Sequence, residues 1–377
     1  MNFYSNCQSK IENNWDHSKI SQIQVDISNK VTTCFASISA ILSILISYKV
    51  RKRRLLITIN FVISGIVFLF YLLVNENSYW LVIVLRGING ISLGFFQSVH
   101  ISYIIHFASG DSLAFHGCLI QFAMFLSLII LNLMIYALSW KVIVAIISVQ
   151  SFAFSGLIWI VPESPVLSKS FSGQQIYRHP HLKYLIVMIS IMVIQCFSGI
   201  GFMVDNCPRL MQKIGIEMDS SLYSVLTNFI GCLSTLICSF IIDIIGVRYL
   251  WAFSGFGLVI SLVLYAITLK ANCPNWLGVF AVFLYFLFFG FGEGPIPWLL
   301  CGVIFPEVVM IESGGINCFM NRFMDIWFGY LLNAITKRFG EFGSVIFNAA
   351  FSLVGALVGL VFIPALKNII PENTTLL

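Results

Sequence analysis

Charge is scarce in this sequence: Asp, Glu, Lys and Arg make up 10% of its 377 residues, against about 25% in ordinary soluble domains. The basic residues are dispersed rather than gathered into a patch, which argues against a nucleic-acid partner. None of the 10 cysteines has the Cys-x-x-Cys spacing of zinc or redox sites. We therefore expect no metal and no cofactor. No Ser/His/Asp arrangement is recognisable either, so we do not expect an enzyme.

Apolar residues are abundant instead, at 59% of the chain, against about 45–50% in soluble domains. They form long runs, and about 20 apolar residues in a helix are enough to cross a bilayer. The sequence therefore predicts an all-α membrane protein surrounded by lipid. Eleven runs are long enough, at residues 31–48, 55–74, 79–107, 117–138, 141–161, 184–204, 221–245, 249–269, 276–304, 315–335 and 343–365.

The polar segments predict how the chain is organised. Residues 1–30 are polar and lack the apolar stretch of a signal peptide. A polar cytoplasmic linker at 162–183 separates an N-terminal helical half, 31–161, from a C-terminal half, 184–366, and residues 367–377 form a tail. Since basic loops prefer the cytoplasm, the five basic residues within 49–54 place the first loop inside. We expect an exofacial N-terminus, a cytoplasmic C-terminus and residence in the plasma membrane.

Several motifs occur in a fixed order along the chain. They are Arg86-Gly87-x-x-Gly90-x-x-x-Gly94, Pro162-Glu163-Ser164-Pro165, Gln195-x-x-Ser198-Gly199-Ile200, Asp243-x-x-Gly246-x-Arg248 and Gly294-Pro295-Ile296-Pro297-Trp298. In this order and spacing the chain resembles the sugar-porter branch of the major facilitator superfamily. The resemblance implies a major facilitator-type bundle in which a small solute binds between two helical halves.

The sequence also departs from that family pattern. Polar residues 1–30 stand where the family has the exofacial loop before its second helix, so the first family helix has no counterpart. We therefore expect about 11 transmembrane helices, five plus six, instead of 12. The charged residues that join cytoplasmic helix ends are depleted, with Val166 and Val303 replacing an arginine and a glutamate. The sugar site is eroded, because the eleventh-helix motif of the family carries Arg322 and Asp325 here.

Polar side chains inside the apolar runs are the candidate site residues, since a charge at bilayer depth costs about 2.5–3.5 kcal/mol without a partner or a wet cavity. Glu293 lies among glycines and prolines that break a helix, and broken helices line binding cavities in transporters. For Arg322 and Asp325, three residues apart, a structural ion pair and a substrate or proton role both stay open. The predicted substrate-binding residues are Gln195, Ser198, Asn228, Glu293, Trp298, Asn321 and Asp325.

Four charged residues near helix ends are predicted to act in gating: Arg86, Glu163, Asp243 and Arg248. Arg86 has the alternative of extending to the outer membrane surface. The resemblance implies a transporter of a hexose or a similar small sugar or polyol by alternating access. It favours facilitative transport, because the proton symporters of the family use an acid on the first helix, and proton symport stays open with Asp325 or Glu293 as a substitute acid. Two alternatives stay open: a non-transporting paralogue or sensor, and a transporter of a different small polar solute.

Overall fold

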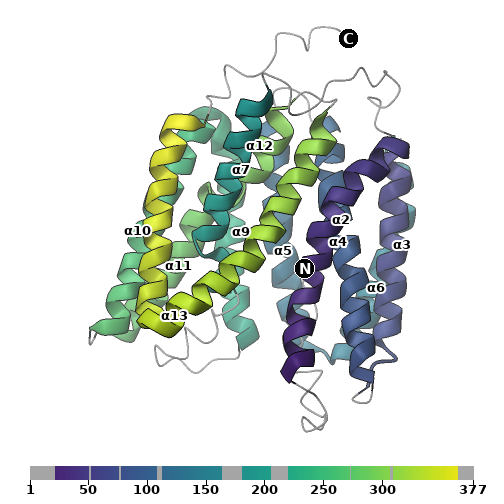
Figure 1. Cartoon of the computed structure of the whole chain (residues 1–377), viewed down its shortest axis with the longest axis horizontal. Coiled ribbons are helices and arrows are strands. Elements are labelled where there is room, and N and C mark those ends of the chain that lie inside the picture. Colours follow the sequence, from purple (N-terminus) through teal and green to yellow (C-terminus); the bar gives the residue numbers. More distant parts are fainter. Residues whose placement is uncertain are drawn as a thin grey trace. The chain divides into compact units, whose positions relative to one another are not determined.

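The computed structural model describes residues 22–50, 52–75, 78–107, 113–163, 181–204, 220–271, 273–305 and 309–363. Throughout these ranges the chain forms helices and their connections, with no strand (Figure 1). An all-helical membrane protein was expected from the apolar runs, and the described residues confirm it. Ten of their helices are long and apolar enough to cross a membrane.

The first five predicted spans are found as five long helices. The helices are α2 (Gln22–Lys49), α3 (Arg53–Tyr71), α4 (Tyr79–Phe107), α5 (Leu113–Ala137) and α6 (Trp140–Leu157), which the short 3-10 helix η4 (Ile158–Ile160) extends. Helix α2 begins inside the segment that was predicted to be polar up to residue 30. Its 28 residues extend about 42 Å at 1.5 Å per residue, whereas the hydrocarbon core is about 30 Å thick. The polar first turns therefore have room outside the hydrocarbon.

The remaining predicted spans correspond to α7 (His181–Phe197), α9 (Ser220–Ile245), α10 (Val247–Lys270), α11 (Asn275–Phe291), α12 (Ile296–Val303) and α13 (Met310–Phe362). Helices α11 and α12 together occupy one apolar run and are broken between Phe291 and Ile296. Helix α13 has 53 residues and bends at Gly340, where φ is 70°. Figure 1 shows its two arms, green and yellow. Since those arms match two apolar runs, the described helices supply the eleven predicted crossings.

The chain divides into two compact units, each with its own contacts. Unit 1 comprises Met1–His106, Leu131–Gln175 and Glu307–Ile326. Its helices α3 and α6 approach closely because small groups face each other: the Ser148 hydroxyl donates a 2.8 Å hydrogen bond to the Gly65 carbonyl. Large apolar side chains such as Phe68 and Ile143 fill the space around them. The first third of α13, up to Ile326, belongs to this unit.

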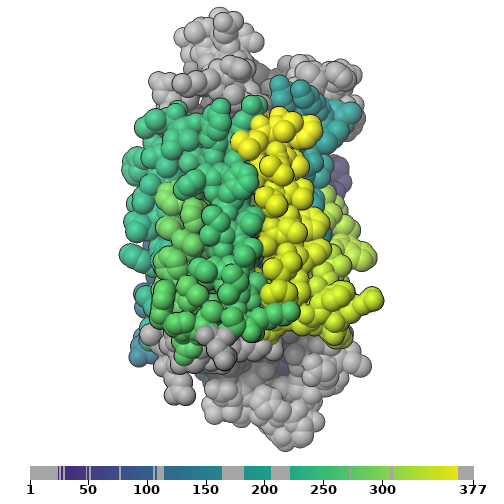
Figure 2. All heavy atoms as spheres, turned by 90° about the vertical axis from the view of Figure 1, so that its left-hand side faces the viewer, coloured from purple at the N-terminus to yellow at the C-terminus, as the bar shows by residue number. Residues whose placement is uncertain are grey.

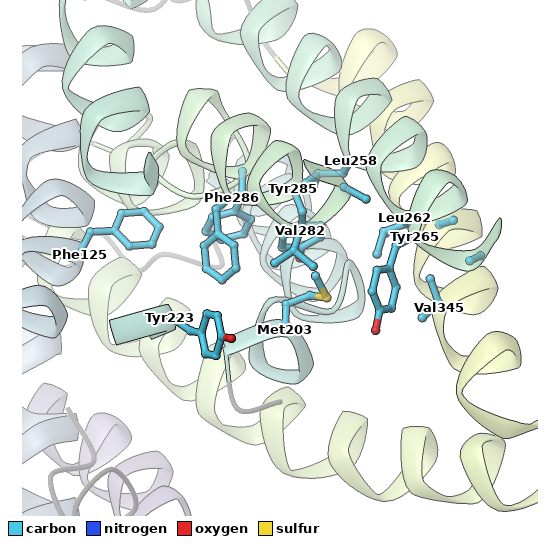
Figure 3. Packing of buried hydrophobic residues seen from close by; sticks show 14 of the residues in the cluster. Phe125, Met203, Tyr223, Leu258, Leu262, Tyr265, Val282, Tyr285, Phe286 and Val345 are labelled. Carbon is cyan, nitrogen blue, oxygen red and sulfur yellow. The ribbon is translucent and has the colours of Figure 1, made fainter. Parts of the chain in front are cut away.

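Unit 2 comprises Phe107–Ile130, Ile176–Pro306 and Trp327–Leu377. Its core is rich in aromatic residues and includes Phe125, Tyr285 and Phe286 (Figure 3). On its outer face, the green helices lie beside the yellow arm of α13 (Figure 2). That face exposes large apolar side chains, among them Phe253 of α10 at 52% and Val361 of α13 at 68%, as expected for contact with lipid.

Candidate functional site

Two helix breaks in unit 2 are held together by one amide side chain. Helix α7 ends at Phe197, and Gly199 follows with φ +93°, a conformation that favours glycine. The Gln195 Nε2 group donates hydrogen bonds to the carbonyl oxygens of Glu293, at 2.6 Å, and Gly294, at 3.0 Å. These carbonyls belong to the break between α11 and α12, where irregular backbone needs partners inside the membrane. Gln195 supplies them, and its side chain is 3% exposed.

Further hydrogen bonds fix the same two breaks. The Ser198 hydroxyl donates to the Gln195 carbonyl at 2.8 Å, and the Tyr285 hydroxyl donates to the Ser198 carbonyl at 3.2 Å. On the other side, the Glu293 N–H donates to the Ser254 hydroxyl oxygen at 2.8 Å. Helices α7, α10 and α11 therefore all hold the break in place. The structure brings three predicted site residues together here, namely Gln195, Ser198 and Glu293.

The Glu293 side chain is completely enclosed by protein, with 0% exposure. Neither carboxyl oxygen has a hydrogen-bond partner among the described residues. Oε1 lies 3.9 Å from the position that a Cβ atom would take on Gly355 of α13. The absence of a side chain at Gly355 leaves the carboxyl group room. The Glu293 carboxyl group is therefore enclosed by protein at this helix break.

Trp298 and Asn228 are also buried in unit 2, at 3% and 2% exposure. Trp298 lies in α12 directly after the break. Asn228 lies in α9, where its Nδ2 group donates to the Ser224 carbonyl at 2.6 Å and its Oδ1 atom has no hydrogen-bond partner in the described structure. One half of the Asn228 amide thus stabilises its own helix, and the other half is left without a protein donor.

The predicted residues of the eleventh span lie in the part of α13 that belongs to unit 1. The Arg322 guanidinium donates from Nε and Nη2 to Gln97 Oε1 on α4, at 3.2 and 2.8 Å. The Cys318 thiol also points to this oxygen, at 3.5 Å. Asn321 is half-buried and Asp325 is exposed. Gln97 is a functional candidate that the sequence reasoning missed, although a glutamine within an apolar run was a usable signal.

One of the two alternatives for Arg322 and Asp325 was a closed ion pair. Among the described residues these two side chains form no ion pair, and Arg322 donates to Gln97 instead. The reason is geometric: Gln97 offers a carbonyl oxygen to two guanidinium N–H groups at once, and this directs Arg322 toward α4. Asp325 is left without a cation in contact.

The predicted gating residue Glu163 is bound to the beginning of α3 in unit 1. Its Oε1 atom accepts the backbone N–H of Arg54 at 3.1 Å, as expected for an anion at a helix N-terminus. The Arg54 guanidinium in turn donates to the Val161 carbonyl at 3.2 Å and lies 4.4 Å from the Trp159 ring centroid. The Tyr103 hydroxyl donates to the Pro162 carbonyl at 2.8 Å. The Pro162-Glu163 motif therefore joins α3, α4 and η4.

The other predicted gating residues have different surroundings. Arg86 is 1% exposed, so the alternative in which it extends to the membrane surface is wrong: α4 carries it into the protein interior. In unit 2, the Arg248 Nε group donates to the Ile363 carbonyl at 2.7 Å and thereby satisfies the end of α13. Asp243 is exposed near the end of α9. Residues 164–180, 205–219 and 306–308 lie outside the described residues.

A groove on unit 2 can be set aside as a sugar site. It has a volume of about 560 Å³ and lies between α9, α10 and α11, with a lining that includes Ile237, Tyr249, Phe253 and Phe291. Because these side chains are almost entirely apolar, the groove offers little to the hydroxyl groups of a sugar. Its surroundings suit the lipid acyl chains that cover such a face.

A family model described as "Sugar (and other) transporter" matches residues 167–374, which is more than half of the chain. The facilitated trehalose transporter Tret1 of Apis mellifera ligustica is 24% identical over 195 residues, covering 50% of this chain and 38% of that protein. Facilitated glucose transporter member 8 of solute carrier family 2, from Mus musculus, is 29% identical over 240 residues, covering 56% of this chain and 50% of that protein. The matches thus span half or less of these relatives.

Solved structures match over nearly the whole length of the chain. A major facilitator superfamily proton:xylose symporter, bound to 6-bromo-6-deoxy-D-glucose, superimposes with a TM-score of 0.82 at 15% identity, covering 96% of this chain and 92% of that one. An inward-open xylose transporter from E. coli has a TM-score of 0.70 at 16% identity, with coverage of 97% and 93%. These likenesses confirm the major facilitator fold of a multi-pass membrane protein.

Proposed function

Because the chain belongs to the sugar (and other) transporter family, we propose that it moves a hexose or a similar small sugar or polyol across a membrane. Transport is facilitative and proceeds by alternating access, in which two helical halves expose a central site to each side in turn. No covalent step is involved. The plasma membrane is the proposed location.

The observation that carries this proposal is the pair of helix breaks joined by Gln195. Irregular backbone at membrane depth is characteristic of transporter binding sites, because it survives only where protein groups or a cavity satisfy it. Here a single amide accounts for two carbonyls of the break, at 2.6 and 3.0 Å. A small movement of α7 lets the Gln195 amide leave those carbonyls and bind sugar hydroxyls instead. Sugar hydroxyls are both donors and acceptors. In the same unit, Ser198 and Asn228 add further uncharged hydrogen-bonding groups, and Trp298 adds a flat surface for the sugar ring. In unit 1, Asn321 is a further candidate of this kind.

Asp325 adds a charged side chain to the first arm of α13, in the part of that arm that belongs to unit 1. It lies fifteen residues after Met310 and fifteen before the bend at Gly340, and therefore at the middle of the span. Cys318, two turns earlier on the same face, is 0% exposed, whereas Trp327 on the opposite face is 58% exposed. Asp325 is thus an exposed carboxylate on the protein-facing side of its helix. We propose that it accepts hydrogen bonds from solute hydroxyl groups.

Transport by the purified protein tests the proposal directly. The full chain is reconstituted in lipid vesicles, and uptake of radiolabelled hexose is measured with and without an excess of unlabelled hexose. We expect saturable uptake that the competitor suppresses. The variant Gln195→Leu leaves the Glu293 and Gly294 carbonyls without their donor. It also removes the amide that is proposed to bind a sugar hydroxyl. Because an unsatisfied buried group costs about 1–3 kcal/mol, we expect the apparent affinity to fall by about 5- to 150-fold.

A matched control is available on α6. Gln150 is exposed on that helix, so Gln150→Leu makes the same chemical change away from the breaks and leaves uptake unchanged. Uptake by the wild type that equals uptake by empty vesicles, while a family member reconstituted in parallel works, contradicts the proposal and favours a sensor or another non-transporting paralogue. Uptake of a different polar solute in place of a hexose retains the transporter and corrects its substrate.

A gating role is proposed for Arg86, Glu163, Asp243 and Arg248. The contacts that support it are the hydrogen bonds of Glu163 to the beginning of α3 and of Arg248 to the end of α13. Each bond joins helix ends within its own unit, the first in unit 1 and the second in unit 2. Helix movements during a transport cycle that separate these ends have to break the bonds.

A further inference from the structure

Three fully buried polar side chains of unit 2 lack hydrogen-bond partners within the described structure. They are Glu293 at the break between α11 and α12, and Asn348 and Ser352 in the second arm of α13. Each is 0% exposed. The atoms without partners are both carboxyl oxygens of Glu293, the nitrogen and oxygen of the Asn348 amide, and the Ser352 hydroxyl oxygen. Buried polar groups of proteins are nearly always paired, so five such atoms in one unit need an explanation.

Asn348 and Glu293 lie at the two helix breaks, and Ser352 lies on α13 between Asn348 and Gly355. Asn348 and Ser352 lie one turn apart on α13, and Gly355 continues the same face of that helix. Asn348 is in contact with Gly199 at the α7 break, where a Cβ atom would collide with its amide. At the other end of this face, the Glu293 Oε1 atom lies 3.9 Å from the Cβ position of Gly355. The polar face of α13 therefore runs from one break to the other.

Ser198 completes this group, which we call the buried polar cluster: Ser198, Glu293, Asn348 and Ser352. The Ser198 hydroxyl lies beside the Glu293 carboxyl group. Its proton is directed to the Gln195 carbonyl, at 2.8 Å. The lone pairs of Ser198 are then available as acceptors, as are the oxygens of Glu293, Asn348 and Ser352. Acceptor oxygens outnumber donors in the cluster, whose remaining donors are the Asn348 Nδ2 group and the Ser352 hydroxyl.

The groups around Glu293 supply no positive charge. Helix α7 and the turn after it contribute Gln195 and Ser198, α10 contributes Ser254, and α11 contributes Tyr285, whose hydroxyl donates to the Ser198 carbonyl. In the described residues, no Lys, Arg or His side chain forms an ion pair with Glu293. A bare carboxylate in the protein interior is unfavourable by several kcal/mol. A bound cation removes that cost.

We propose that the buried polar cluster binds a small monovalent cation, either a proton or Na⁺. One carboxylate requires one positive charge, and oxygen donors from carboxylate, amide and hydroxyl groups suit hard cations. The described residues contain no group of three His, Cys, Asp or Glu side chains suited to a metal ion, which directs the assignment to a monovalent species. This site goes beyond the proposed transport of sugar and does not depend on it.

Thermal unfolding of the purified full chain in detergent tests the site without any sugar. Wild type is melted in mildly acidic and alkaline buffers, each with sodium chloride or with choline chloride at equal ionic strength. A ligand that binds only the folded state raises the stability of that state. The proton and Na⁺ therefore predict different changes in Tm. A proton predicts a Tm that falls by several degrees from acidic to alkaline pH in both salts. Na⁺ predicts a Tm at alkaline pH that is several degrees higher in sodium than in choline.

The variant Glu293→Gln keeps the shape of the side chain and removes the charge. We expect it to lose the dependence of Tm on pH or Na⁺ and to melt, in alkaline choline buffer, at or above the wild-type Tm. Glu341→Gln is the matched control, since Glu341 follows the bend at Gly340 and lies outside the cluster. It should retain the wild-type response.

A wild-type Tm that responds to neither ion overturns the proposal, and so does an unchanged response in Glu293→Gln. If Glu293→Gln does not fold, Ser352→Ala decides. It removes one oxygen of the cluster and should shift the midpoint of the ion titration about tenfold toward higher ion concentration, in which case the proposal stands. An unshifted midpoint in Ser352→Ala contradicts it. A negative transport assay leaves all these readouts intact, so the two proposals fail separately.

Discussion

The arginines of unit 1 and the buried glutamate of unit 2 differ in how their charges are satisfied. In unit 1, Arg54 donates to the Val161 carbonyl, Arg53 to the Ser102 carbonyl at 3.1 Å, and Arg322 to Gln97. In unit 2, Glu293 has neither oxygen paired among the described residues. The difference follows from the chemistry of a helical bundle. Helix N–H groups are consumed by intrahelical bonds, whereas carbonyl oxygens retain a second lone pair and accept from a long cationic side chain.

A buried anion is therefore harder to satisfy in such a bundle than a buried cation. The cations of unit 1 reach carbonyl groups with flexible stems, but a glutamate has to find one of the few side-chain donors. Gln195 and Tyr285 donate to backbone carbonyls of the same breaks and are not available to Glu293. This contrast supports the proposed cation site at Glu293 and favours a structural role for Arg322.

The largest effect is expected from removing the partner of Arg322. The variant Gln97→Leu leaves the guanidinium without its acceptor and should destabilise the protein by about 3 kcal/mol. Thermal unfolding and surface expression measure this loss. The double variant Gln97→Leu with Arg322→Met removes the stranded cation as well and should recover most of the stability. A single Gln97→Leu variant that melts like the wild type contradicts the idea that unit 1 depends on its paired cations.

A second prediction concerns the α7 break. Gly199 has φ +93°, and a Cβ atom there collides with the Asn348 amide. Gly199→Ala should therefore cost about 2 kcal/mol, from backbone strain and from the collision together. Gly246 is the matched control, because its φ is +92° and nothing lies within 4 Å of its Cβ position. Gly246→Ala should cost about 1 kcal/mol from strain alone. Equal losses of Tm in the two variants show that Asn348 is not held against the break.

The number of spans and the broken helix were predictable from sequence, because bilayer thickness fixes the length of each apolar run. The Gly294-Pro295-Ile296-Pro297 motif predicted the α11–α12 break, because its prolines lack the N–H groups that a continuous helix needs. The partners of the site residues were not predictable. Gln97 and Arg322 are 225 positions apart, and only tertiary packing shows that they meet.

The buried face of α13 carried a signal that the sequence reasoning did not use. Asn348, Ser352 and Gly355 recur with helical spacing inside an apolar run. Such a row predicts a polar or close-packed helix face, but nothing in it indicates which neighbouring helix supplies Glu293. The start of α2 at Gln22 was missed because a helix continues beyond the hydrocarbon, whereas hydrophobicity reports only the part within it.

A smaller effect is expected at the cytoplasmic motif of unit 1. Glu163→Gln keeps an acceptor for the Arg54 N–H but removes the negative charge from the beginning of α3. The loss should be about 0.5–1 kcal/mol, detectable as a small decrease in Tm that shrinks at high salt. Tyr103→Phe is informative beside it, because it removes the 2.8 Å hydrogen bond to the Pro162 carbonyl and no charge. A decrease that is independent of salt in Glu163→Gln shows that the helix dipole is not responsible.

The smallest effect on folding, and a clear one on transport, is expected at Asp325. Its carboxylate is exposed, and Arg322 is already engaged by Gln97, so Asp325→Asn removes no contact and should leave the Tm unchanged. A carboxylate accepts sugar hydroxyl protons more strongly than an amide does, so the apparent affinity for hexose should fall by about tenfold, or 1.4 kcal/mol. The control adds Asn333→Asp to the Asp325→Asn variant. Since Asn333 lies on another face of α13, the new carboxylate should not restore the affinity for hexose. Destabilisation of Asp325→Asn that Arg322→Met relieves would show that the two charges depend on each other after all. It would also make the unit 1 arm of α13 a charge-paired element rather than a solute-contacting one.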